Sequence, residues 1–306
     1  WVKFYDGTQT TADEFLISTV SNDARPWSSS EVGVGVAYAI VTSRFNREMF
    51  QGQPRVVFVV DGIELYDPST DTIGTGNDLP ALQAYHLLKG LEYDGKWFYG
   101  LQNVAASRFP TDDWIARIEQ CRVDVPGAAG MTDAELEETF GEAVIPSTYR
   151  SGGEISVDIE IGTALESVLS GCNGRLVDTG WQYRLLIGVN ETTAATISDD
   201  DVLANHEQSF VPFFGLNELT NGVTAVYPDP SNEWKNQSAP PLYVEEYEAE
   251  DGDRRLLEQA DMDMVPYSEQ VQRLMAAVLA EARRFYGLVF RPQRIRREAF
   301  PPRWYL

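Results

Sequence analysis

Histidine is nearly absent from this sequence of 306 residues, which contains only His86 and His206. Histidine is the commonest general base in enzymes, so its scarcity disfavours acid–base catalysis at neutral pH. The motifs G-x-S-x-G and H-E-x-x-H are also missing. His86 falls on an apolar helical stripe and His206 in a polar stretch, so we expect neither to be catalytic. The sequence predicts a protein that is not an enzyme; a triad assembled from distant residues is the alternative left open.

Cysteine and long apolar runs are equally scarce. Cys121 and Cys172 are isolated from any CxxC pair, which disfavours a disulfide framework or a zinc site and predicts two reduced thiols in the core. No apolar run approaches the length of a membrane span, and no signal-peptide pattern opens the sequence. The sequence starts at Trp1 and stops at PPRWYL, which reads as the start of another strand. We therefore expect a segment of a longer protein.

Basic side chains are few: 24 lysines and arginines stand against 47 acidic residues, a formal charge of -23. Such a chain is repelled by a phosphate backbone, which disfavours a nucleic-acid binder but not a protein through which DNA merely passes. Two acidic stretches, 198–201 and 248–253, could hold calcium, but neither has the spacing of an EF-hand loop. Glycine-rich phosphate loops are missing too. We expect solvated acidic loops, with no metal and no cofactor.

The few basic residues are unevenly placed. Between residue 283 and the last residue there are seven arginines and one glutamate. Such a run is usually a solvated face, and the alternative is a docking face for an acidic neighbour, either a second copy or an adjacent protein. The interface residues expected here are Arg294, Arg296 and Arg297.

Aromatic residues are plentiful but scattered, so core or interface packing is favoured over a sugar-binding platform. EYDGKWFYG at 92–100 is the best local contact surface, with Trp97 as its expected interface residue. In AVYPDPSNEWKNQ at 225–237, Pro228 and Pro230 are expected to end a strand because proline cannot donate to a ladder. Trp234 is then predicted to pack under the following crossing, against another chain.

Periodicity predicts both strands and helices, without a βαβ repeat, and hence an α+β fold. Alternating apolar residues predict strands at 32–45, 55–68, 153–162, 174–189 and 220–230, with turns at Asp61–Gly62 and Thr179–Gly180. Residues 71–77 read as a loop. Apolar residues at three- and four-residue spacing predict helices around Leu165–Leu169 and over 268–287. Further helices are expected after a cap at Asn77 or Asp78, from Thr111 onward, and after a capping box formed by Thr132 and Glu135.

Several stretches, taken in order, resemble the tip attachment protein J family of lambda-like long-tailed phages and the hub proteins of gene transfer agents. The stretches are 25–68, 77–90 (NDLPALQAYHLLKG), 149–188 and 220–290, the last with SEQVQRL opening its long helix. The sequence departs from the family pattern at Asp78-Leu79-Pro80, where proline usually follows asparagine directly, and at Val271. Residues 91–147 match nothing in the family.

The resemblance implies a structural hub, or central fibre protein, at the distal tip of a tail in the virion. It implies a homotrimer whose tail-tube-like β-barrel or sandwich domains carry an inserted α/β domain. The expected segments are a β-rich hub segment at 1–76, a mainly helical region at 77–148, a small α/β domain at 149–215, and a β hub segment with a long helix at 216–306.

Partners follow from the same resemblance. They are the distal tail protein and other tail-tip proteins, the tape measure protein, and DNA that passes without specific binding. The host receptor is expected to be bound by regions outside this segment. Two alternatives are a cell-wall polysaccharide hydrolase, which needs a carboxylate pair in a groove, and a carbohydrate-binding adsorption module.

Overall fold

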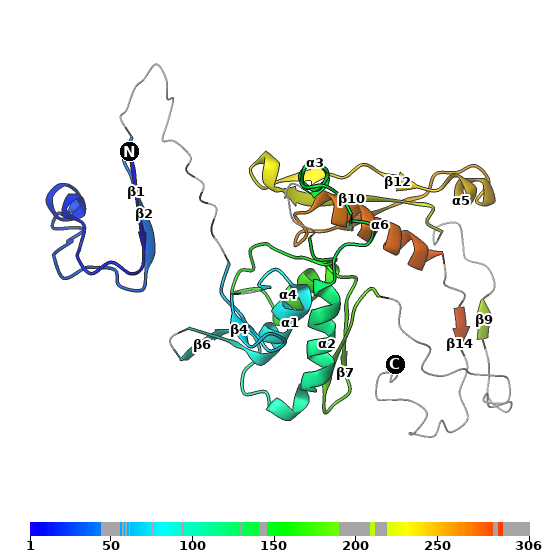
Figure 1. The fold of residues 1–306 in the computed structure, drawn as a ribbon, viewed down its shortest axis with the longest axis horizontal. Helices are drawn as coiled ribbons and strands as arrows, with labels where there is room; N and C mark the ends of the chain where they lie inside the picture. Colours follow the sequence, from blue (N-terminus) through cyan, green and yellow to red (C-terminus); the bar gives the residue numbers. More distant parts are fainter. Residues whose placement is uncertain are drawn as a thin grey trace, which may run out of the picture. The chain divides into compact units, whose positions relative to one another are not determined.

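The computed structural model describes residues 1–43, 56, 58, 60, 62–74, 76–93, 95–128, 130–140, 146–189, 209–211, 219–283 and 287–289. The chain divides into two units, residues 1–61 (the small unit) and 62–306 (the large unit). Helices and small sheets alternate along the chain, as Figure 1 shows, which confirms the predicted α+β class. Three of the four predicted segments, those from residue 77 onward, fall inside the large unit.

The small unit is built on one antiparallel strand pair. Strand β1 (Val2–Asp6) pairs with β2 (Ala37–Val41), with Val2 opposite Val41 and Asp6 opposite Ala37. The strand expected over 32–45 therefore begins at Ala37, five residues further along the chain. Gly33 and Gly35 have φ values of 73° and 75°, which place them in turns, and the Gly35 amide donates to the Gly7 carbonyl at 2.8 Å.

The large unit opens differently from the hairpin expected at Asp61–Gly62. Asp61 lies outside the described residues, and residues 62–65 form no strand. The first strand is β3 (Tyr66–Asp67), which pairs with β4 (Thr72–Ile73) inside the stretch expected to be a loop. The turn forms here because the buried Asp67 carboxylate accepts from the Ser69 amide and binds Arg122.

Helices α1 (Pro80–Lys89), α2 (Thr111–Arg122) and α4 (Ile161–Ser170) pack together, with α1 in contact with both others. Their apolar stripes are buried as predicted; Leu82, Leu88, Trp114, Ile118 and Val168 are at most 1% exposed. The expected cap of α1 is wrong. Leu79 is the N-cap, because the Asn77 side chain accepts a hydrogen bond from the Leu65 amide instead.

Two further predictions for this part of the chain have opposite outcomes. Residues 153–162 do not form the expected strand; they stay irregular up to residue 160, and Ile161 begins α4. Val157 and Ile159 of the alternating set are 66% and 40% exposed, since no strand among the described residues is paired with them. The hairpin over 174–189 is confirmed as β7 (Arg175–Asp178) and β8 (Tyr183–Leu186), which packs on α2.

The remaining elements surround β10 (Gly222–Asp229), the central strand of a four-stranded sheet. It pairs with β11 (Lys235–Ser238) and β12 (Leu242–Tyr243) in antiparallel fashion and with β13 (Leu257–Asp261) in parallel. Helix α6 (Ser268–Ala282) packs on β10 (Figure 1), which confirms the long helix. The strand does not stop before Pro228, which pairs opposite Asn236.

The outlying elements are short. They are a π-helical turn at Leu16–Val20, hairpin strands β5 (Leu91–Tyr93) and β6 (Lys96–Tyr99), 3-10 turns at Ala106–Arg108 and Pro230–Asn232, helices α3 (Asp133–Phe140) and α5 (Glu245–Glu250), and the paired strands β9 (Ser209–Val211) and β14 (Gly287–Val289). The Thr132 and Glu135 capping box opens α3 as predicted. Gly287 begins β14 rather than ending α6.

Candidate interaction surfaces

The β1–β2 sheet of the small unit has two unlike faces. On one face, Tyr5 stacks on Tyr38 with 4.6 Å between ring centroids, and Ile40 is buried beside them. The Asp13 carboxylate closes this face; it accepts from Lys3 Nζ at 2.6 Å and from the Tyr5 hydroxyl at 2.5 Å. These hydrogen bonds, that of Lys3 first, lower the pKa of Asp13 to about 2.

The opposite face of this sheet is apolar and largely exposed among the residues that the structure describes. Val2, Phe4 and Val41 lie on it, because they alternate with Lys3, Tyr5 and Ile40 along the two strands. Phe4 is 69% exposed, Val2 50% and Val41 39%. Phe58 meets Phe4 edge-on at 6.2 Å between centroids. We call Val2, Phe4 and Val41 the apolar face; alternation in the first six residues, which prediction overlooked, is the signal that marks it.

Trp97 lies on the β5–β6 hairpin, where its exposed fraction is 43%. It is held against the helix end at Gly90, whose φ of 96° and close approach to the Leu101 carbonyl admit no side chain. Phe98 and Tyr93 of the same hairpin are 40% and 64% exposed. Tyr99 instead turns inward, and its hydroxyl donates to the Ile159 carbonyl at 2.9 Å. The hairpin is thus anchored at one end and offers aromatic rings at the other.

Trp234, predicted to pack under the following crossing against another chain, is partly exposed in the single chain. It follows Glu233 in the turn between β10 and β11, and the two residues have left-handed φ values of 60° and 57°. The indole is 43% exposed. A role for Trp234 at an interface with another chain stays a prediction.

Of the other residues considered as interface, catalytic or metal-binding candidates, some lie outside the described residues and others have structural partners. Arg294, Arg296, Arg297 and His206 lie outside the described residues. His86 donates through Nε2 to the Tyr66 carbonyl at 2.7 Å, and burial lowers its pKa, so the neutral ring has a structural contact. Of the acidic stretch 248–253, Glu248 pairs with Arg255, and Glu250 and Asp251 pair with Arg283.

Cys121 and Cys172 are free and fully buried, as predicted. No sequence pattern indicates that they interact, yet a hydrogen bond with Cys121 and burial raise the pKa of the Cys172 thiol well above its usual range. Among the described residues, no group of three or more His, Cys, Asp or Glu side chains could hold a metal ion. The helices described here include none that is long and apolar enough to cross a bilayer.

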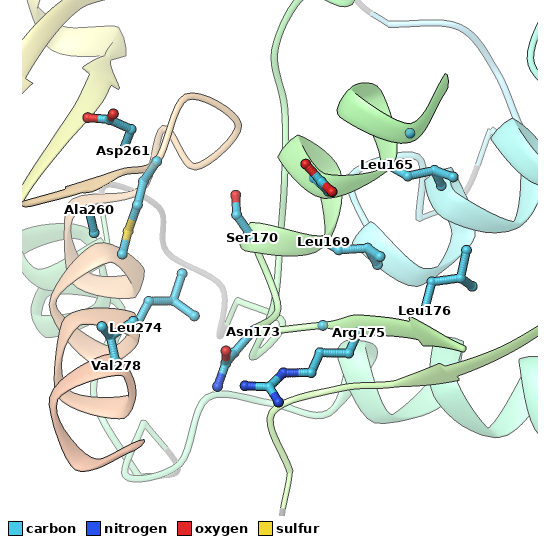
Figure 2. Close-up of a pocket in the computed structure, with 14 residues that line it drawn as sticks. Leu165, Leu169, Ser170, Asn173, Arg175, Leu176, Ala260, Asp261, Leu274 and Val278 are labelled. Atoms are coloured by element: carbon cyan, nitrogen blue, oxygen red, sulfur yellow. The ribbon is translucent and has the colours of Figure 1, made fainter. Parts of the chain in front are cut away.

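One cavity of about 510 Å³ lies in the large unit (Figure 2). Side chains of α4 and β7 form one wall and those of β13 and α6 the other. Its floor is apolar, and charged groups are found at Glu166, Arg175 and Asp261. A volume of this order is typical of ligand and peptide sites.

Comparison with known proteins assigns no family to the chain, so these surfaces are interpreted from their own geometry. No protein-family model matches the sequence, and the search of curated proteins finds no significant match.

Proposed function

We propose that this chain is a structural, non-enzymatic subunit: a hub or central fibre protein at the distal tip of a phage or gene-transfer-agent tail. Three copies form a ring that joins the tail tube to the host-contacting fibre. The ring leaves a channel for the tape measure protein and then for DNA. The ordered resemblance of 25–68, 77–90, 149–188 and 220–290 to that family supplies the identity of the assembly.

The apolar face of the β1–β2 sheet is the structural observation that best supports assembly of several copies. Ile40 is the single buried hydrophobic residue of the small unit among those the structure describes. A two-stranded pair with so little core is marginally stable alone, and needs further strands or a packed layer. Val2, Phe4 and Val41 are where such a layer would be added. Neighbouring copies would supply it, and their strand edges would pair through main-chain hydrogen bonds.

The finer architecture belongs to the same proposal. The β1–β2 pairs of three copies contribute to a tail-tube-like β-barrel or sandwich, and the segment expected at 149–215 corresponds to the inserted α/β domain. The exposed rings of Trp97 and Trp234 are then contacts with neighbouring chains or with the distal tail protein. The formal charge of -23 suits a wall that DNA passes without binding.

The test is the mass of the full chain in solution, measured by light scattering during size exclusion, together with its position in intact particles by electron microscopy. We expect a trimer for the unmodified chain and a monomer for Phe4→Glu, because a carboxylate on the apolar face cannot be buried without a large desolvation cost. Phe58→Glu is a second variant at the same contact.

Thr8→Glu is the matched control, since Thr8 is exposed and lies outside the apolar face, so its added charge should leave the mass unchanged. A stable monomer that is missing from tail tips would overturn the proposal. Glycan binding that is lost in Trp97→Ala, or wall-degrading activity abolished by one acidic substitution, would replace it with an adsorption module or a hydrolase.

A further inference from the structure

The cavity between α4 and α6 combines an apolar floor with an acidic rim. Leu165, Leu169 and Leu274 of the floor are no more than 7% exposed, whereas Glu166 and Asp261 are exposed at its edge. Figure 2 shows Leu165 and Leu169 of α4 grouped with Leu176 of β7 on one side of the gap, and Leu274 and Val278 of α6 on the other. Its shape and chemistry suit an apolar segment that also carries positive charge.

The rim is negative because its one basic residue is already neutralised. Arg175 forms an ion pair with Glu281 of α6. Glu166 and Asp261 form no ion pair within the part of the chain that the structure describes; Asp261 accepts only a hydrogen bond from the Gln259 amide at 3.0 Å. Two carboxylates at the edge of an apolar site favour an occupant with guanidinium groups, which pair with carboxylates through two parallel hydrogen bonds.

We propose that this cavity binds residues 290–306 of the same chain. That stretch, FRPQRIRREAFPPRWYL, has five arginines against one glutamate and apolar residues between them. Its charge is therefore opposite to that of the rim, and its phenylalanines and isoleucine match the floor. Its three prolines favour the extended left-handed conformation that aromatic and apolar grooves recognise. This inference does not depend on the proposed tail-tip function.

The connection to the cavity is short enough for the segment to reach its own chain. Val278 lines the cavity, and α6 ends at Ala282. The five residues from Val278 to Arg283 advance roughly 8 Å along a helix. The chain then passes through β14, which pairs with β9, and the six residues from Val289 to Ile295 can span about 20 Å when extended. A tethered segment also has a millimolar effective concentration at a site within reach, so it binds there before it binds a neighbouring copy.

Photo-crosslinking in the full chain tests the proposal. In Phe300→p-benzoylphenylalanine the probe keeps an aromatic ring, and peptide mapping after irradiation identifies what it touches. We expect crosslinks within one chain to residues 162–176 or 260–278, with a yield independent of protein concentration. A second chain with the probe at Phe290 should give crosslinks to the same two stretches.

Charge reversal supplies the matched comparison. Glu166→Arg combined with Asp261→Arg should lower the intramolecular crosslink yield about tenfold, because two attractive pairs become repulsive. Glu245→Arg combined with Glu246→Arg changes the net charge equally on α5, where both residues are exposed, and should leave the yield unchanged. Circular dichroism melting checks that both variants fold.

Crosslinks to any other surface, or crosslinks only between chains, would overturn the proposal, as would an equal loss of yield in both charge-reversed variants. The result is distinct from that of the assembly test, since a monomeric chain can still dock its own segment and a trimer can leave the cavity unfilled.

Discussion

Gln270 is the side chain that joins α6 most directly to the helical part of the large unit. It is fully buried; its amide oxygen accepts from the Arg150 amide at 3.0 Å, and its nitrogen donates to the carbonyls of Arg150 and Gly171, each at 2.7 Å. Gln270→Leu leaves these backbone groups buried and unpaired, so the free energy of unfolding should fall by about 2–4 kcal/mol in urea titrations.

Gln272→Leu on the same helix is the control for that substitution. Its amide donates to the Pro240 carbonyl at an exposed position, where water replaces the lost bond. We expect a loss below about 1 kcal/mol. Equal losses in the two variants would show that helix propensity, not the buried network, determines the effect.

Asp13 gives a pH dependence at the residue scale. Because its pKa of about 2 in the folded chain lies below the ordinary value of 3.8 for an aspartate, the ionised carboxylate stabilises the small unit. That contribution is present above pH 3.8 and is lost as the pH falls through 2. Carbon-13 NMR titration of the full chain should find this low pKa, and Lys3→Met should raise it, since the hydrogen bond with Lys3 is its largest cause. A titration unchanged by Lys3→Met would contradict this assignment.

The β10–β11 hairpin stores backbone strain at the element scale. Glu233 and Trp234 adopt left-handed φ values that cost an L-residue about 1 kcal/mol or more and suit glycine. Trp234→Gly should therefore stabilise the chain by up to about 1 kcal/mol in thermal or urea unfolding. Such strain is often retained where the side chain has a role, so the same variant should assemble less well.

Trp97→Gly is the contrasting case for this element prediction. Trp97 is in a strand with ordinary φ, so glycine there loses both packing and strand propensity, and stability should fall by about 1 kcal/mol or more. If both glycine variants were destabilised to the same degree, relief of strain at Trp234 would be ruled out.

At the scale of the whole molecule, net charge affects how copies of the chain associate. Copies that each carry -23 repel one another, so the association of copies through the uncharged apolar face should tighten as salt rises from about 0.05 to 0.5 M and the Debye length shortens. Docking of the arginine-rich segment on the acidic rim should weaken over the same range. Sedimentation and crosslink yield measured across one salt series therefore separate the two interactions; a trimer that weakens with salt would contradict an apolar interface.

Elements whose signals are local can be predicted from the sequence alone. Helix α6, the stripe of α2, the Thr132–Glu135 capping box and the β7–β8 turn at Thr179–Gly180 each depend on residues a few positions apart, and each was predicted. The scarcity of histidine and cysteine and the net charge also required nothing but the sequence.

Tertiary structure decided the features that depend on distant partners. Residues 153–160 alternate like a strand but pair with no strand in the part of the chain that the structure describes, and the turn after β3 forms where Arg122 reaches Asp67. The cavity requires α4, β7, β13 and α6 to meet, and no local pattern reports that. The exposure of Phe4 and Trp234 likewise depends on which described residues lie against them in space. Burial is a property of neighbours in space, so periodicity can identify an apolar face but cannot say what will cover it.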